Sequence, residues 1–69
     1  MRTTEIIDDQ EIEIHWNEIL EILEHHDSGC KEALILGDGS NGKQYQALGW
    51  LQDGEIVDLQ TDPDIEEVI

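Results

Sequence analysis

The sequence predicts an α+β fold, in which one amphipathic helix packs on a small antiparallel β-meander of about three to four strands. Three observations predict this fold. Apolar residues recur at helical spacing between Ile12 and Leu23. A short apolar run at residues 33–36 is typical of a buried strand, and Asp53-Gly54 between two apolar stretches is typical of a β-hairpin. With 69 residues, the chain is expected to form one acidic domain over residues 1–69.

The first half of the chain is expected to supply the helix. Thr3 to Ile7 are β-prone, so residues 1–8 are expected to form an N-terminal arm or an edge strand, and Asp8 or Asp9 could then cap the helix. The helix would end at Asp27-Ser28-Gly29, where Gly29 suits a left-handed cap. An alternative stays open, because residues 11–15 alternate like a strand and Asn17 could cap a shorter helix.

The second half is expected to form the sheet. A turn at Asp53-Gly54 would place Gln52 opposite Glu55, Leu51 opposite Ile56, Trp50 opposite Val57 and Leu48 opposite Leu59. Residues 44–52 can also be interpreted as a helix. Residues 61–69 form a C-terminal tail, in which Asp62 and Pro63 predict the start of a short helix. The expected core is Ile12, Trp16, Ile19, Leu20, Leu23, Leu34, Leu36, Leu48, Trp50, Val57 and Leu59.

Charge dominates the composition. The chain has 18 acidic and three basic residues, which gives a formal net charge of −15. This charge repels phosphate backbones and anionic membranes, so we expect no direct nucleic-acid binding and no membrane binding. It attracts basic protein surfaces, although solubility or a high-salt cell would also explain it. The oligomeric state does not follow from these features.

The single cysteine, Cys30, excludes a disulfide within the chain and favours a reducing compartment. No apolar run approaches the ~20 residues that span a bilayer, and the first residues lack the apolar segment of a signal peptide. The sequence therefore predicts a cytoplasmic protein.

The glycine-rich segment between residues 37 and 43 matches G-x-G-x-x-G and most of G-x-x-x-x-G-K. Phosphate binding by either motif needs a helix directly afterwards, and the second motif needs Ser or Thr where Gln44 stands. An ordinary hairpin loop is the preferred interpretation. The alternative function is a small-ligand or nucleotide-binding module that uses Gly37, Asp38, Gly39, Gly42 and Lys43.

Residues with metal-binding or catalytic chemistry are few. The three histidines, His15, His25 and His26, and Cys30 match no zinc spacing, and no nucleophile has a marked base beside it. We expect no metal, no cofactor and no catalytic residue, and hence a protein that is not an enzyme.

The remaining functional candidate is an acidic surface, which would be the outward face of the expected helix. Such a row of carboxylates could bind a basic protein and could occupy a groove built for nucleic acid, as a DNA-mimicking inhibitor does. A merely solvated face would look the same in the sequence. The expected partner-binding residues are Asp8, Asp9, Glu11, Glu18, Glu21 and Glu24, with Glu13 and Asp27 nearby.

Overall fold

The computed structural model describes residues 1–25 and 29–69 and shows an all-β protein, without a helix in those residues. The expected α+β fold is therefore wrong. Six strands form one antiparallel sheet in the order β1-β2-β3-β4-β5, and β6 also pairs with β4. The strands are β1 (Arg2–Ile7), β2 (Gln10–His25), β3 (Cys30–Gly39), β4 (Gln44–Gln52), β5 (Glu55–Leu59) and β6 (Glu66–Val68).

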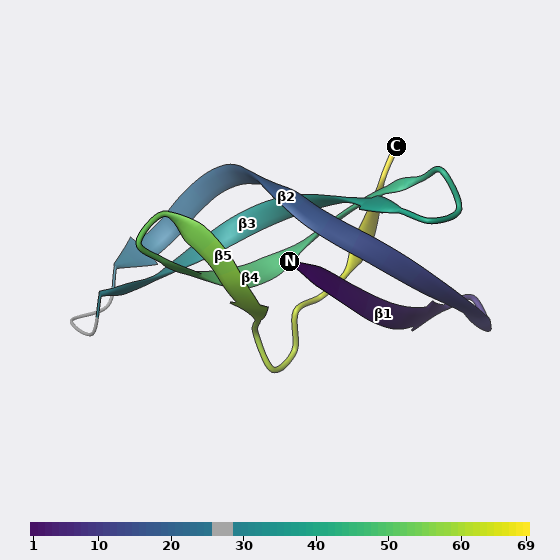
Figure 1. The fold of residues 1–69 in the computed structure, drawn as a ribbon, viewed down its shortest axis with the longest axis horizontal. Helices are drawn as coiled ribbons and strands as arrows, with labels where there is room; N and C mark the ends of the chain where they lie inside the picture. Colours follow the sequence, from purple (N-terminus) through teal and green to yellow (C-terminus); the bar gives the residue numbers. More distant parts are fainter. Residues whose placement is uncertain (26–28) are drawn as a thin grey trace.

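The sheet is curled into a half-barrel (Figure 1), with extents of 38 × 19 × 17 Å. β2 runs along the length of the molecule and arches at one end (Figure 1). β1 pairs with its first half and is an edge strand, which was one of the two expectations for residues 1–8. We call the face that carries the buried core the concave face and the opposite face the convex face.

The segment expected to be a helix is the 16-residue strand β2. Its first part alternates, with Ile12 and Ile14 buried and Glu11 and Glu13 exposed, so the strand alternative was correct there. Beyond Trp16, register shifts interrupt its pairing with β3 three times, between Trp16/Glu18, Ile19/Glu21 and Ile22/Glu24. A β-bulge adds one residue to one strand, so these shifts turn a period of two into a period of three. That period imitates the helical one and explains the wrong prediction.

The bulged half of β2 contains the repeated triplet Glu-Ile-Leu at residues 18–20 and 21–23. In each triplet the Ile is opposite a buried residue of β3, Ile35 or Ala33, whereas the Glu is opposite Leu36 or Leu34. Since directly paired residues point to the same face, Ile belongs to the concave face and Glu to the convex face. Strict alternation after Trp16 would instead have placed Glu18 on the concave face. Each bulge thus keeps the glutamates on the convex side.

The core lies on the concave face, where large side chains meet small ones. It consists of Ile12, Ile14, Trp16, Ala33, Ile35, Tyr45, Ala47 and Leu51. Of the expected core residues, Ile12 and Trp16 are confirmed. Four others are exposed, namely Ile19, Leu20, Leu23 and Val57, and four are partly buried on the convex face, namely Leu34, Leu36, Leu48 and Trp50. Leu59 is partly buried and packs against the core cluster.

The β4–β5 hairpin follows the expected turn. Asp53 and Gly54 have φ of 52° and 80°, Gln52 is opposite Glu55, and Leu51 is opposite Ile56, as predicted. A register shift between Trp50 and Leu51 then puts Trp50 opposite Asp58, so the expected pairing with Val57 is wrong. Leu59 pairs with Gly49 and not with Leu48.

The expected core face of β4 is also wrong. Tyr45, Ala47, Gly49 and Leu51 are buried, whereas Leu48 and Trp50 lie on the convex face. A Cβ at Gly49 would come within 2.7 Å of Ile35 Cδ1, so Ile35 fills the space that a larger residue of β4 would need. Steric fit inside the tightly curled sheet decided this face, and total hydrophobicity did not.

Two further expectations concern short segments. Residues 44–52 are a strand, which excludes their interpretation as a helix. The short helix expected after Asp62 is wrong, because residues 66–68 form β6 and pair with Gln44–Gln46. The helix end expected at residues 27–29 lies mostly outside the described residues, although Gly29 does have a positive φ of 83°.

Candidate protein-interaction surface

An acidic row runs along the convex face of β2. We use this name for Glu11, Glu13, Glu18 and Glu21, all of which are exposed. Glu11 and Glu13 are two residues apart, and the bulge makes the three-residue step from Glu18 to Glu21 equivalent to the two-residue step from Leu36 to Leu34. Both steps therefore cover about 7 Å. The glutamates expected on one face of a helix thus share one face of a strand.

The other predicted partner-binding residues lie at the two ends of β2. Asp8 and Asp9 form the exposed β1–β2 turn, with φ of 51° and 62°. Glu24 is in register with Glu32 near the far end of β2. Asp27 lies outside the described residues. The structure therefore places Asp8, Asp9, Glu11, Glu18 and Glu21 on one exposed hairpin.

Basic residues offset little of this charge. Arg2 Nη1 lies 3.0 Å from Glu13 Oε1, and Lys43 Nζ lies 3.3 Å from Glu67 Oε1. Both pairs are largely exposed, and such pairs add little stability. Arg2 and Lys43 are therefore already bound to carboxylates.

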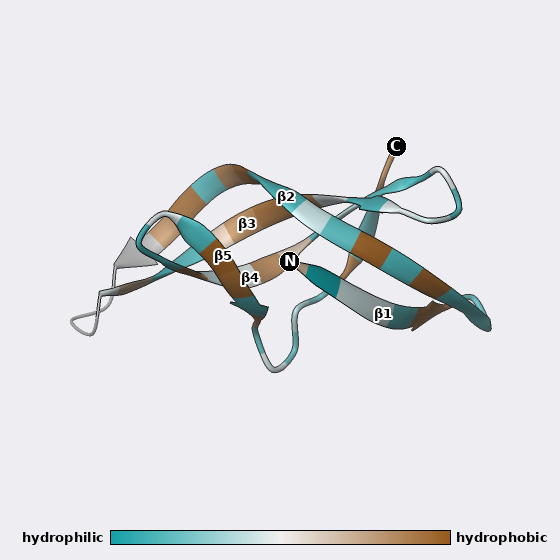
Figure 2. Ribbon diagram, in the orientation of Figure 1, coloured by the Kyte–Doolittle hydropathy of each residue, from teal (hydrophilic) through white to brown (hydrophobic). Residues whose placement is uncertain are grey.

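An apolar strip lies beside the acidic row on the convex face. It comprises Leu34 and Leu36 of β3 with Leu48 and Trp50 of β4, all partly buried. Cross-strand pairing puts Leu36 opposite Glu18 and Leu34 opposite Glu21, as well as Leu34 opposite Leu48. In Figure 2, brown and teal bands alternate along β2, beside a mainly brown stretch of β3.

Asp38 is the centre of a polar group on the same face. Its carboxylate accepts hydrogen bonds from Asn17 Nδ2 at 3.1 Å and from Gln44 Nε2 at 3.3 Å. These two hydrogen bonds hold the pKa of Asp38 below its usual value of 3.8, against an opposing effect of burial, and a weaker electrostatic effect of His15 lowers it as well. Asp38 thus stays ionised and joins β2, β3 and β4 at the surface.

The glycine-rich segment forms the end of β3 and the β3–β4 hairpin loop. Gly39 N donates to Lys43 O, Gly42 N donates to Gly39 O, and Ser40 N donates to Glu13 O. Lys43 N donates to Asn41 Oδ1. Asn41 Nδ2 in turn donates to the hydroxyl of buried Tyr45. These backbone amides are therefore already used within the protein, whereas a phosphate-binding loop points its amides at the ligand.

The glycines of this segment have structural reasons to be there. A Cβ at Gly37 would lie 2.6 Å from Ile14 Cγ2, and one at Gly39 would lie 2.6 Å from Asn41 Oδ1. Gly42 has φ of 83°, which favours glycine. The strand β4 follows, where the phosphate motifs require a helix. Gly37, Asp38, Gly39, Gly42 and Lys43 are thus brought together, but as a hairpin, and this geometry weighs against the ligand-module alternative.

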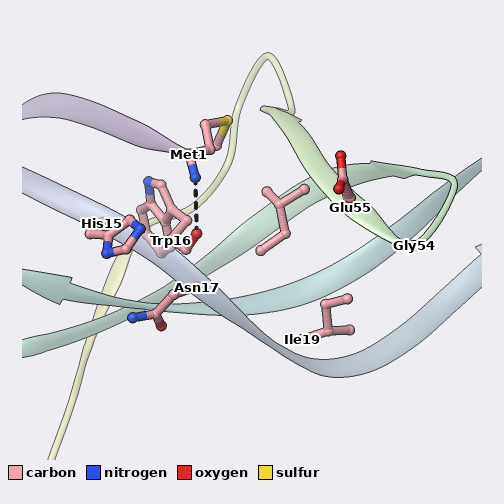
Figure 3. Close-up of a pocket in the computed structure, with 8 residues that line it drawn as sticks. Met1, His15, Trp16, Asn17, Ile19, Gly54 and Glu55 are labelled. Carbon is pink, nitrogen blue, oxygen red and sulfur yellow. Dashed lines mark hydrogen bonds between the residues drawn. The ribbon is translucent and has the colours of Figure 1, made fainter.

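A groove of about 410 Å³ opens at the unpaired edge of β2, where its bulged half begins and faces the β4–β5 hairpin. β2 contributes His15, Trp16, Asn17 and Ile19, the β4–β5 hairpin contributes Gly54, Glu55 and Ile56, and Met1 completes the lining. In Figure 3, Met1, His15, Trp16 and Asn17 gather at one end of the groove, with Gly54 and Glu55 at the hairpin turn.

The groove exists because the barrel does not close. β1 pairs with β2 only from Gln10 to His15, and its last link is a pair of contacts between Met1 and Trp16. Beyond Trp16, no described strand pairs with that edge of β2. Sequence reasoning missed this groove, although the Glu-Ile-Leu repeat is a signal that could have indicated a bulged strand.

Other chemistry is sparse in residues 1–25 and 29–69. There, no three His, Cys, Asp or Glu side chains lie close enough together to hold a metal ion. Cys30 is a partly buried free thiol. The same residues contain no helix with the length and apolar character needed to cross a membrane.

The fold and surface define an all-β, single-sheet half-barrel with an acidic row on its convex face and a groove of mixed polar and apolar lining between β2 and the β4–β5 hairpin. No protein-family model, curated protein or solved structure matches the chain.

Proposed function

We propose that this chain is a non-enzymatic interaction or regulatory protein that binds a basic protein surface through the acidic row. The observation that carries the proposal is the common face of Glu11, Glu18 and Glu21, which the bulges of β2 preserve over the length of the strand. A charge of −15 supplies long-range attraction to any basic partner. The proposal includes a cytoplasmic location, for which the single cysteine is the support.

The proposal extends to the kind of basic partner. A protein whose groove normally holds nucleic acid offers clustered Lys and Arg side chains, which a row of carboxylates can neutralise. We therefore propose that the chain acts as a nucleic-acid mimic and blocks that groove. Nucleic acid itself would not bind this chain, because both carry the same sign of charge.

The test starts with identification of the partner. Immobilised protein captures basic proteins from source-cell lysate at two salt concentrations, and each purified partner is then measured by stopped-flow association. The triple variant Glu11→Lys, Glu18→Lys, Glu21→Lys should slow association about tenfold at low salt and flatten its salt dependence, because surface charges mainly set the association rate.

A matched control has the same net charge but an intact acidic row. The variant Glu5→Lys, Asp62→Lys, Glu66→Lys reverses acids on other elements and should retain most of the association rate. Equal effects of the two triple variants would show that only the net charge matters and would contradict a specific surface. Duplex DNA should compete with the wild-type chain for the partner, and simultaneous binding of both would contradict the mimic.

The loop supplies a second control. Substitution of Gly42 and Lys43 should leave the binding of the partner unchanged, provided that the variant folds. Loss of binding in this variant, with a silent triple reversal at β2, would favour the ligand module instead.

A further inference from the structure

We propose that the groove between β2 and the β4–β5 hairpin is the anchoring site for an extended, alternating basic and apolar segment of the partner protein. This inference rests on the proposed function, because it takes the partner to be basic. The groove adds a second part to the interface. The acidic row attracts the basic partner, and apolar contacts in the groove then hold it.

The apolar side of the argument is exposure. Ile19 and Ile22 belong to the concave face, yet 38% and 45% of their surfaces are exposed, because no described strand continues β1 beside them. An apolar side chain that enters the groove would meet Ile19 and Ile56, which line it, and a segment that continues along β2 would also cover Ile22.

The charged side of the argument selects the occupant. Glu55 lines the groove, and Glu18 and Glu21 flank Ile19 and Ile22 along the same stretch of β2. A second copy of this chain would bring another net charge of −15 to these carboxylates, which disfavours self-association. A segment with Lys or Arg beside its apolar residues complements both features.

The extended conformation follows from the two faces of β2. Successive residues of a strand point to opposite sides, so a segment lying along β2 beyond Trp16 presents alternate residues to the concave and convex faces. The concave residues meet Ile19 and Ile22, and the convex ones meet Glu18 and Glu21. Alternation of apolar and basic residues is therefore the pattern that fits.

The experiment uses synthetic peptides about eight residues long, a typical strand length, as probes of the full chain. One alternates Lys with Leu, one alternates Lys with Ser, and one alternates Glu with Leu. Titrations followed by NMR should show the Lys/Leu peptide shifting the methyl signals of Ile19, Ile22 and Ile56 and the indole signal of Trp16. The Lys/Ser peptide should shift only signals of the acidic row.

Variants then separate the groove from the acidic row. Ile19→Ser should weaken Lys/Leu binding about tenfold, which corresponds to the loss of roughly two buried methylene groups. The matched control is Ile6→Ser, since Ile6 is 71% exposed on β1, outside the groove. Ile6→Ser should bind like the wild type, and each variant is first checked for a folded spectrum.

The outcomes distinguish this inference from the proposed function. Equal affinities for the two Lys peptides, without shifts at the groove, would overturn the inference and leave the acidic row intact. Equal binding of the Glu/Leu peptide in the groove would overturn the claim that the occupant is basic. Dimerisation that Ile19→Ser abolishes would identify the occupant as a second copy and would also overturn the inference.

Discussion

Gly37 and Trp16 are directly opposite each other in β3 and β2, and a Cβ at Gly37 would lie only 2.8 Å from Cε3 of the indole. Trp16 is fully buried and is one of the residues that line the groove. The glycine therefore makes room for the largest side chain of the core. Packing against Trp16 therefore explains why glycine occupies the first position of the phosphate-like motif.

We expect Gly37→Ala to destabilise the protein by about 1–3 kcal/mol, because an added methyl group in a close-packed core forces side chains or backbone to move. Urea unfolding followed by tryptophan fluorescence measures the loss. The expected fall in melting temperature is about 4–8 °C for each kcal/mol in a domain of this size. An unchanged midpoint would mean that Trp16 does not pack against Gly37.

The indole nitrogen of Trp16 donates to Thr3 Oγ1 at 2.9 Å. Thr3→Val keeps the shape of the side chain but removes the acceptor, so a buried N–H loses its partner at a cost of about 1–3 kcal/mol. Thr4→Val is the matched control, since Thr4 is exposed on the other face of β1, and it should change the unfolding free energy by less than about 0.5 kcal/mol. Equal effects of the two variants would exclude a role for this hydrogen bond.

The β1–β2 turn has positive φ at both Asp8 and Asp9, which costs a residue other than glycine about 1–2 kcal/mol. Asp9→Gly converts it to the Asp-Gly turn that Asp53 and Gly54 already form. We expect a gain of about 0.5–1 kcal/mol after the added entropy of the unfolded chain, measured by thermal unfolding. The reverse change, Gly54→Asp, should lower the melting temperature, and a gain there would contradict the turn geometry.

Asp38 should titrate below its ordinary pKa of 3.8, because hydrogen bonds from Asn17 and Gln44 favour the ionised form. Asn17→Ala should raise the pKa of Asp38 towards 3.8, and by more than Gln44→Ala does. Carboxyl carbon shifts measured by NMR against pH report both values. The opposite order of the two effects would contradict the ranking of the hydrogen bonds.

The sign of the pH effect on stability follows from the depressed pKa. A carboxyl group whose pKa is lower in the folded state stabilises that state above its unfolded pKa, and this contribution is lost as the pH falls through the folded pKa. The stability advantage of the wild type over Asp38→Asn should therefore be constant near neutral pH and decrease only below about pH 4.

Salt should stabilise the folded protein, because a net charge of −15 makes the acids repel one another and the ion pairs of Arg2 and Lys43 are exposed. We expect the melting temperature to rise by about 5 °C, or roughly 1 kcal/mol, between low salt and ~0.5 M sodium chloride. Glu18→Gln with Glu21→Gln should reduce the rise. A fall in melting temperature with salt would show that the acids do not crowd each other.

Turn chemistry was the part of the fold most accessible from the sequence. Asp53-Gly54 predicted both the turn and the first two pairs of its hairpin, since a two-residue turn fixes the register locally. The predicted register is wrong from Trp50 onwards, because a bulge adds a residue there that no local sequence pattern indicates. The prediction of the buried face of β4 was wrong for a different reason. Ile35 determines how much space remains at Gly49, and the sequence of β4 alone does not contain that information.

The helix prediction was wrong because the spacing of the apolar residues in β2 depends on its pairing with β3. Ile19 and Ile22 are three residues apart, which fits a helix and also a strand with one bulge in each repeat. Only the pairing with β3 distinguishes the two. The acidic candidates survived the change of fold, because Glu18 and Glu21 keep a common face in either structure.

The bulged triplets of β2 also bear on how the length of this chain can vary. Each triplet covers the same distance as two residues of β3, so insertion or deletion of a whole Glu-Ile-Leu unit would leave the facing of the remaining β2 residues unchanged. A change of one residue would exchange the faces of everything beyond it, and would place carboxylates against the core. Related sequences that keep this architecture are therefore expected to differ here in steps of three residues.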